Sequence, residues 1–345
     1  MVSKKRHHYI PKFYLKRFSI NNEGKSLGLY NLNNGKFIQS APLKNQAYEN
    51  FLYGEDDEIE NALARMENII AKMFYYWTEE KIFCSPPVGT NGFKLLRQFI
   101  LYQAYRTPKS GNNIMEALNQ GAKTFVKEFK PELWERLKNV TLVHENPVLL
   151  GLFHSIEYEH LLDFLDCKFL VNLSALSFIT SDAPVILYNQ LMEQAGNYMG
   201  ATGLVAKGLQ ILYPIHPRLM ICLYDSNVYD FGNGCTNCCS TESVEDIHQL
   251  NGLQLINSNS QLFFDDSVSE EYIKELLNHF EEYRKTAKNI NRIINQGSQR
   301  FFLTSSEDAH IDLDLTFFKL KVNPNDYRNE ITPLRHPSLK RPSQK

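Results

Sequence analysis

Residues 209–224 read LQILYPIHPRLMICLY and hold two apolar runs, 209–213 and 219–224, joined by Pro214-Ile215-His216-Pro217. Both runs are short and continuous, without the alternation of a half-exposed strand. The pattern predicts two strands that are buried on both faces of a sheet. We therefore expect this pair to lie at the centre of the main sheet.

The segments around this pair predict strands and helices in separate blocks. Upstream, 168–173 and 176–180 are expected to be strands, and an Asn33-Asn34-Gly35 turn predicts an earlier hairpin. Apolar residues at spacings of three and four predict helices. Their expected ranges are 57–80, 90–106, 112–129, 148–165, 243–258 and 269–294. Further strands are expected near 301–303 and 313–321.

The order of these elements predicts the α+β class, with a mixed β-sheet core flanked by several long helices. We expect one large domain over residues 1–325, with a helical N-terminal half and a sheet-rich middle. Within it, a helical lobe spans about 57–165 and a sheet lobe about 166–265, with a packing helix at 269–294. Residues 326–345 are polar, basic and contain proline, so a flexible tail is expected there.

The composition of the 345-residue chain is that of an ordinary globular protein, with 43% hydrophobic residues and a net charge of -2. No apolar stretch approaches the roughly 18 residues of a membrane span. The basic N-terminus lacks the apolar region of a secretory signal. Without an export signal, the six cysteines are expected to be free thiols, and the location to be cytoplasmic.

Four motifs carry a resemblance to a known family. They are His-His-Tyr-Ile-Pro-Lys-Phe-Tyr-Leu-Lys-Arg-Phe at 7–18, Gln-Ala-Tyr-Arg-Thr-Pro at 103–108, Phe-Ile-Thr-Ser-Asp-Ala-Pro-Val at 178–185, and Asn251 with Gln254. In this order the chain resembles the bacterial family catalogued as domain of unknown function 4238. The family usually has Asn at the position of Ala183. The resemblance implies a protein without an established activity, and some similar genes are candidate anti-phage defence genes.

His7 and His8 are the first candidate catalytic residues. An imidazole can act as a general base or bind a metal ion, and Pro11 stiffens the segment. In a loop both rings can face one point, whereas in a strand neighbouring side chains alternate between faces. The structural alternative is that one ring makes a hydrogen bond and the other packs on Tyr9.

Gln103, Arg106 and Asp182 complete the catalytic candidates. Gln103 and Arg106 share one face of the expected helix at 90–106. The planar guanidinium of Arg106 could bind an anionic substrate group, or its charge could stabilise the helix C-terminus. Asp182 follows an expected strand and could bind a metal or orient a histidine, or it could form a local turn before Pro184.

Substrate contacts are predicted at Tyr9, Lys12, Asn251 and Gln254. Basic residues interleave with aromatic ones in the first 18 residues, a pattern typical of nucleic-acid contact surfaces. The alternative is a solvated charged face whose aromatic rings pack inward. The Cys-x-x-Cys-Cys segment at 235–239 lacks the second pair that a structural zinc site needs, and its role stays open.

Two functional hypotheses follow. In the first, His7 or His8, Arg106 and Asp182 converge in a cleft and catalyse metal-assisted phosphodiester hydrolysis, with nucleic acid as the substrate and a divalent metal as the cofactor. In the second, the chain is a non-catalytic binding or sensing module, and the same polar residues form a buried structural network. The enzyme hypothesis predicts that the three side chains lie within about 8–10 Å of each other. The module hypothesis predicts full hydrogen-bond satisfaction, no concave pocket and no metal.

Overall fold

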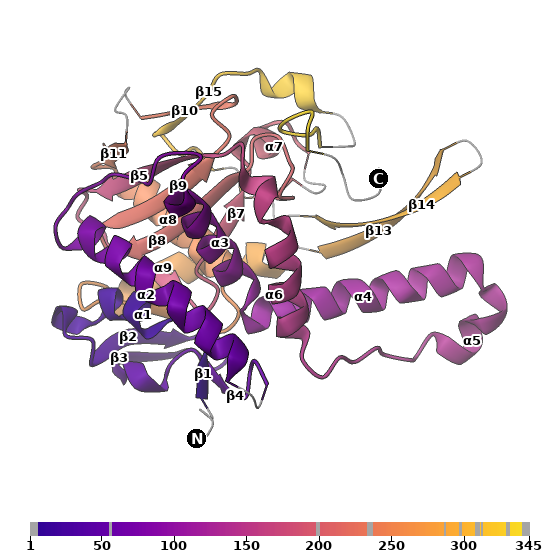
Figure 1. Cartoon of the computed structure of the whole chain (residues 1–345), viewed down its shortest axis with the longest axis horizontal. Helices are drawn as coiled ribbons and strands as arrows, with labels where there is room; N and C mark the ends of the chain where they lie inside the picture. Colours follow the sequence, from indigo (N-terminus) through magenta and orange to yellow (C-terminus); the bar gives the residue numbers. More distant parts are fainter. Residues whose placement is uncertain are drawn as a thin grey trace.

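The computed structural model describes residues 6–54, 57–197, 201–232, 237–285, 288–296, 299–307, 311, 313–328 and 332–339. It has the expected α+β class, with mixed and antiparallel sheets packed between helices (Figure 1). Among the described residues no helix is both long and apolar enough to cross a membrane.

The central sheet contains five strands in the order β11-β5-β9-β8-β7. Their bounds are β5 Asp166–Asn172, β7 Ile186–Tyr188, β8 Gln210–His216, β9 Leu219–Tyr224 and β11 Cys238–Thr241. Only the β11–β5 pair is parallel, and β5, β9, β8 and β7 pair antiparallel. The predicted pair at 209–224 therefore forms the middle of this sheet.

The two faces of β8 and β9 enter different apolar clusters. Ile211, Tyr213 and Ile221 lie in one cluster with side chains of helices α2 and α3. Their neighbours Leu212 and Cys222 lie in a second cluster with side chains of helices α8 and α9. These five side chains are at most 1% exposed, which confirms burial on both faces. The continuous apolar sequence arises because each strand needs hydrophobic side chains on both sides.

β8 extends further than expected. The predicted strand stops at residue 213, with 214–217 as the connection, but β8 continues through Pro214 to His216. A shift in register between Pro214 and His216 accommodates the proline, which has no backbone N–H to donate. The hydroxyl of Tyr14 donates to the carbonyl of Pro214, so the N-terminal segment is joined to this irregularity.

A second, antiparallel sheet has the order β3-β2-β12-β6. Its strands are β2 Ser26–Asn31, β3 Lys36–Pro42, β6 Thr180–Ser181 and β12 Gln261–Phe264. β2 and β3 form the expected hairpin, and Gly35 in its turn has a positive φ of 66°. The predicted strand at 176–180 shrinks to Thr180–Ser181. The side chain of Asn251, on helix α8 (Val244–Asn257), instead bonds the backbone of Ser177 and Ile179.

Three two-stranded sheets lie outside these two: β1–β4, β10–β15 and β13–β14. Their strands are β1 Arg6–His8, β4 Tyr48–Asn50, β10 Tyr229–Phe231, β13 Lys288–Gln296, β14 Gln299–Glu307 and β15 Phe318–Leu320. The expected strand at 313–321 is therefore shorter than predicted.

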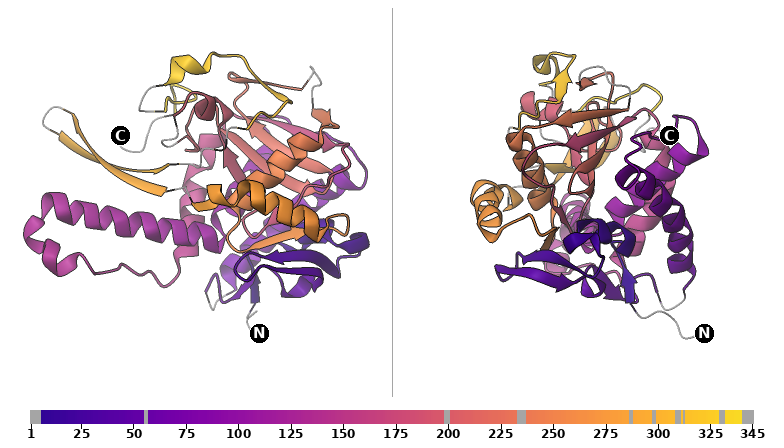
Figure 2. Two further views of the ribbon diagram at one scale, coloured as in Figure 1. Left: turned by 180° about the vertical axis from the view of Figure 1, so that it is seen from behind. Right: turned by 90° about the vertical axis from the view of Figure 1, so that its left-hand side faces the viewer.

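Helices cover both faces of the central sheet (Figure 2). α2 Glu58–Thr78 and α3 Asn91–Tyr105 lie over one face, with the short α1 Lys12–Leu15. α8 Val244–Asn257 and α9 Glu270–Phe280 lie over the other face. The remaining helices are α4 Pro108–Phe129, α5 Trp134–Leu137, α6 Pro147–Tyr158 and α7 Gln190–Gln194. The described chain thus has helices, sheet and helices in three layers.

One helix prediction is wrong. The expected helix at 269–294 ends as α9 at Phe280, and β13 begins at Lys288. β13 pairs antiparallel with β14 along nine residues. The isoleucines at 290, 293 and 294 match a helical spacing, but β-branched residues also favour strands. The adjacent segment supplies a strand partner, which periodicity within one segment cannot reveal.

The C-terminal segment differs from the expected flexible tail at 326–345. Arg335 and Leu339 are 4% and 3% exposed. The guanidinium of Arg335 donates to the carbonyls of Leu161, Leu204 and Ala206, at 2.5, 3.0 and 3.1 Å. These bonds bring Arg335 against the body of the protein, in a part of the chain where a flexible tail was expected.

Helix α4 and the β13–β14 hairpin extend from one side of the body (Figure 1). They lie side by side, and α5 with the chain up to α6 completes a projecting arm that we define as residues 108–146. Several large apolar side chains of the arm are at least 37% exposed: Leu118, Phe125, Leu137, Val140, Leu142 and Val143.

Candidate functional site

His7 and His8 point to opposite sides of strand β1. His7 is fully buried, its Nδ1 accepts a hydrogen bond from the backbone N–H of Tyr53 at 3.1 Å, and the two rings stack at 5.5 Å. His8 is half-buried, and its Nδ1 lies 3.1 Å from the carbonyl oxygen of Gln46. Because β1 is extended, the rings cannot converge on one point.

The environment of His8 disfavours its charged form. Burial lowers the pKa of His8 to about 4, and the positive charge of Lys12 acts in the same direction. The ring is therefore neutral at pH 7, with Nδ1 donating to the carbonyl of Gln46. A carbonyl oxygen fixes this tautomer, since it can only accept.

Gln103 and Arg106 meet at the end of α3. The Oε1 of Gln103 accepts from Nε and Nη2 of Arg106 at 3.0 and 2.6 Å, and the Nε2 of Gln103 donates to the carbonyl of Tyr9 at 3.0 Å. Arg106 Nη1 also donates to Glu67 on α2 at 2.7 Å. The guanidinium that was expected to bind a substrate anion is thus paired with an internal carboxylate.

Arg106 is 1% exposed, yet its charged form is favoured. Burial alone would lower its pKa, but the negative charge of Glu67, together with Tyr53, raises the pKa overall. Glu67 has a side chain that is 24% exposed, so the ion pair reaches toward the surface at α2. Desolvation of Arg106 is compensated by charge pairing and hydrogen bonds, as buried ions require.

Asp182 is enclosed by the turn before β12. Its carboxylate accepts from the backbone N–H groups of Asn259, Ser260 and Gln261 at 2.8, 2.7 and 3.0 Å, and from the Ser260 hydroxyl at 2.8 Å. Burial raises the pKa of Asp182, while these donors oppose the shift. The carboxylate thus organises a backbone turn with little capacity left for a metal or a histidine.

Asn251 and Gln254 on α8 hold the segment that leads to Asp182. Asn251 accepts from the backbone N–H of Ile179 at 2.9 Å and donates to the carbonyl of Ser177 at 2.9 Å. Gln254 donates to the Ser181 hydroxyl and to the carbonyl of Ala183. Both side chains were predicted to contact substrate, and both are 1% exposed within this network.

Tyr9 contacts Gln103 and lies near Asp182. Its backbone carbonyl binds Gln103, and its side chain is 7% exposed. Burial, followed by the negative charge of Asp182, raises the pKa of the Tyr9 hydroxyl. The motif residues therefore lie in one neighbourhood, but its hydrogen bonds run within the protein.

Among the described residues, the buried atoms of this neighbourhood without a hydrogen-bond partner include Nε2 of His7, Oε1 of Gln254 and the hydroxyl of Tyr213. The network is therefore not fully satisfied, although the module hypothesis predicted that it would be. Glu67 and Tyr53, which complete the surroundings of Arg106, were not predicted as site residues. An acidic residue flanked by the apolar Met66 and Ile69-Ile70 on α2 is the sequence signal that could have indicated Glu67.

Lys12 belongs to a different, open site. It lines a pocket of about 500 Å³ with Phe13, Lys16, Gly24, Lys25, Pro42, Leu43 and Lys44. No acidic residue is among these. Lys25 pairs with the nearby Glu23 at 2.8 Å, whereas Lys12, Lys16 and Lys44 form no ion pair within the described part of the chain. This pocket can accept an anion.

The metal-ligand prediction can be checked only for residues that the structure describes. There, the group of three side chains able to hold an ion is His248, Glu275 and His279, which shares no member with the predicted catalytic set. Cys235 lies outside the described residues. Cys238 and Cys239 lie on β11.

The fold and this neighbourhood define an α+β protein in which a buried polar network ties an N-terminal strand to a long helix and to a turn between sheets. The chain belongs to the family described as protein of unknown function (DUF4238), whose model matches residues 6–268. No curated protein and no solved structure shows a significant match to the chain. The resemblance seen in the four motifs is thereby confirmed at the level of the family.

Proposed function

We propose that this chain is a non-catalytic binding module whose ligand is a phosphate-bearing polymer, namely nucleic acid. The lysine pocket beside α1 carries the proposal. The side chains of Lys12, Lys16 and Lys44 are exposed. Lys12 lies on α1, Lys16 begins the 3-10 turn that follows α1, and Lys44 lies in the turn Leu43–Asn45 after β3, so the fold brings two segments together. Unpaired lysines that converge without a carboxylate attract a polyanion by releasing its counterions.

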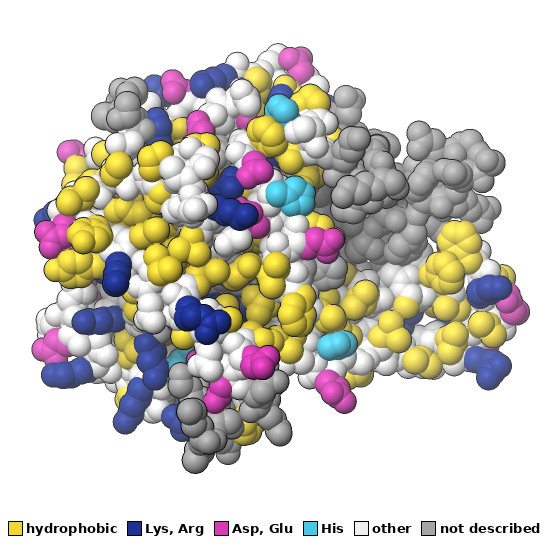
Figure 3. All heavy atoms as spheres, in the orientation of Figure 1, with side chains coloured by type: hydrophobic (Ala, Val, Ile, Leu, Met, Phe, Trp, Pro, Cys, Tyr) yellow, Lys and Arg dark blue, Asp and Glu magenta, His cyan; other side chains and the backbone are white. Residues whose placement is uncertain are grey.

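The wider surface supports this ligand. Basic side chains gather over the lower left of the face in Figure 3, the region of α1, α2, β2 and β3 in Figure 1. Tyr14 and Phe18 of the N-terminal segment are fully buried, so they are not available to stack on bases. We therefore expect contacts to the phosphate backbone, with little sequence preference.

The state of the motif residues supports a non-catalytic role over hydrolysis. Asp182 accepts four hydrogen bonds from its own chain, and Arg106 is paired with Gln103 and Glu67. A hydrolase would need these groups free to contact a scissile phosphate or a metal. A role in anti-phage defence, which the family resemblance implies, and a cytoplasmic location, which the sequence predicts, stay predictions.

The test is binding of labelled DNA and RNA, single- and double-stranded, followed by fluorescence anisotropy at several salt concentrations. The test variant is Lys12→Glu/Lys16→Glu/Lys44→Glu. The matched control is Lys94→Glu/Lys127→Glu/Lys319→Glu, which changes the net charge equally at exposed lysines elsewhere. The test variant should lose most of the affinity, and its salt slope on duplex should fall by about 2–3, roughly one per phosphate contact.

Equal losses in both triple variants would mean that only overall charge matters, and the pocket would be rejected. A parallel incubation of the wild type with Mg²⁺ or Mn²⁺ tests catalysis. The nucleic acids should remain intact. Cleavage that is lost in correctly folded His8→Ala and Asp182→Ala proteins would refute the non-catalytic role and restore the hydrolase hypothesis.

A further inference from the structure

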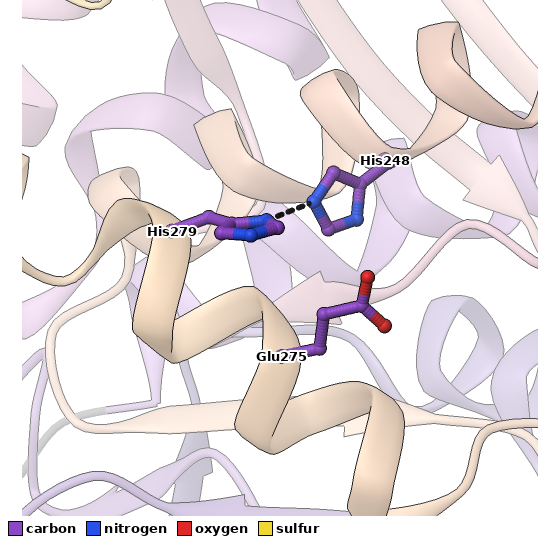
Figure 4. Close-up of side chains that lie close together, drawn as sticks. All are labelled: His248, Glu275 and His279. Carbon is purple, nitrogen blue, oxygen red and sulfur yellow. Dashed lines mark hydrogen bonds between the residues drawn. The ribbon is translucent and has the colours of Figure 1, made fainter.

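Two histidines and a glutamate meet on the surface formed by α8 and α9. His248 belongs to α8, while Glu275 and His279 are one helical turn apart on α9. One ligand atom from each lies within 4.8 Å of the others. Figure 4 shows that the three side chains point toward a common space from the two helices.

The spacing of the ring nitrogens fits a metal site. Nε2 of His248 and Nδ1 of His279 are 3.0 Å apart, and the ring planes are perpendicular. Two nitrogens bound to tetrahedral zinc at about 2.0–2.1 Å would be about 3.3 Å apart. A movement of a few tenths of an ångström therefore converts the hydrogen-bonded pair into two ligands of one ion. The shared proton would move to the far nitrogen of its own ring.

Charge and space at this position also favour a cation. The three residues line a pocket of about 300 Å³ together with Glu245, Tyr272 and Phe280. Glu245 and Glu275 provide two negative charges, and the nearby Lys274 is paired with Glu270 at 2.8 Å.

We propose that His248, Glu275 and His279 bind a divalent transition-metal ion of the zinc class, with one coordination position open to solvent. Imidazole nitrogens suit Zn²⁺, Co²⁺ and Ni²⁺, whereas Mg²⁺ and Ca²⁺ prefer sites made only of oxygen. The ion links α8 to α9. Asn251, which holds the backbone of residues 177–179, lies one turn from His248 on α8, so the ion also steadies the helix that fixes this segment.

This inference goes beyond the proposed function and depends on different residues. The experiment uses the full chain without an affinity tag, so that tag histidines do not contribute. Co²⁺ is titrated and followed by visible absorption, and Zn²⁺ is titrated by calorimetry. The variants are His248→Gln, Glu275→Gln and His279→Gln, with His160→Gln as the control at an exposed histidine on a different element.

The wild type and His160→Gln should bind one equivalent of Co²⁺ or Zn²⁺ and show a raised Tm with Zn²⁺. Each ligand variant should bind at least about tenfold more weakly, since loss of even an outer-shell partner costs that much. Mg²⁺ should not compete. The absence of saturable binding, or equal affinity in a His248→Gln/His279→Gln double variant, would overturn the site. Nucleic-acid binding, measured without added metal, would be unaffected by that result.

Discussion

At the scale of single residues, Asp182 illustrates how a polar motif residue can serve the backbone. Three consecutive N–H groups, those of Asn259, Ser260 and Gln261, turn toward one carboxylate that is 1% exposed. Such groups have no alternative partner once they are buried, so the carboxylate determines whether the turn forms. This backbone turn places β12 beside β2 and β6.

We therefore predict that Asp182→Ala lowers the free energy of unfolding by about 3 kcal/mol, because several buried donors lose their acceptor. Urea denaturation followed by circular dichroism measures the change. Asp266→Ala, at an exposed aspartate in the following loop, serves as the control and should change stability by less than about 0.5 kcal/mol. If the two variants are equally stable, the carboxylate does not organise the turn.

The lowered pKa of His216 predicts how the stability of the fold depends on pH. Burial, followed by the charge of Arg17, lowers the pKa of His216 to about 4. Between about 4 and the ordinary histidine value of about 6.5, the unfolded chain binds the proton and the folded chain does not. Stability therefore falls as the pH drops from about 6.5 to about 4, by roughly 2–3 kcal/mol for His216 at the lower limit.

Urea midpoints at pH 7, 5.5 and 4.5 check this expectation. His216→Gln should show a flatter pH dependence than the wild type, because the variant has no proton to gain at this position. His144→Gln, at an exposed histidine, should keep the wild-type dependence. A wild type that is equally stable at all three values would contradict the lowered pKa.

The sequence identified the polar residues of the candidate site, but it could not show whether each of them contacts a ligand or its own backbone. The motif made His7, Arg106 and Asp182 visible as polar residues in an apolar context. Whether each group faces a ligand or its own backbone depends on segments far along the chain, such as residues 259–261 for Asp182. The lysine pocket likewise combines α1 with the turn after β3. These two segments are far apart in the sequence, so the sequence alone does not show that they meet.

At the scale of elements, the junction between α3 and α4 is the most constrained part of the polar network. Arg106 caps α3, and Thr107 caps α4 by accepting from the N–H of Ser110 at 3.3 Å. α4 then leaves the body as the projecting arm (Figure 1). The Arg106 contacts to Gln103 and Glu67 thus fix the root of the arm against α2 and the N-terminal segment.

Arg106→Ala should reduce stability by about 3–5 kcal/mol, because it leaves Glu67 without a partner in a largely buried setting. Arg106→Met combined with Glu67→Met removes both charges and should recover part of the loss. Thermal denaturation compares the two, with Arg136→Ala on the exposed surface of α5 as the control. If the double variant is less stable than Arg106→Ala, the ion pair is not the source of the effect.

Helices and strands were predicted correctly where the pattern of apolar residues fits only one type of secondary structure. The runs in β8 and β9 are short, continuous and adjacent, so a buried hairpin satisfies them. The segment at 288–294 fits a helix as well as a strand, and pairing with β14 decides between them. The need for glycine at position 28 also depends on a distant segment. A Cβ at Gly28 would come within 2.3 Å of the Phe264 ring on β12, and only the fold brings these two residues together.

At the scale of the whole molecule, the predicted division into a helical lobe and a sheet lobe does not describe the packing. The sheet β3-β2-β12-β6 joins strands before residue 43 to strands after residue 179. One apolar cluster combines α2 and α3 with β8 and β9. The halves of the chain are therefore interleaved in the body, from which the arm and the β13–β14 hairpin project.

Interleaving predicts the outcome of limited trypsin digestion. The arm offers Arg136 and Lys138 on the exposed α5 segment, which projects from the body. The first cut should fall after Arg136 or after Lys138. Both fragments should remain associated in gel filtration, because each supplies strands to the same sheet.

Asn119 bonds both the N–H and the carbonyl of Leu142, so Asn119→Ala should accelerate the cut. A first cut inside the β2–β3 hairpin, or fragments that separate, would contradict this architecture.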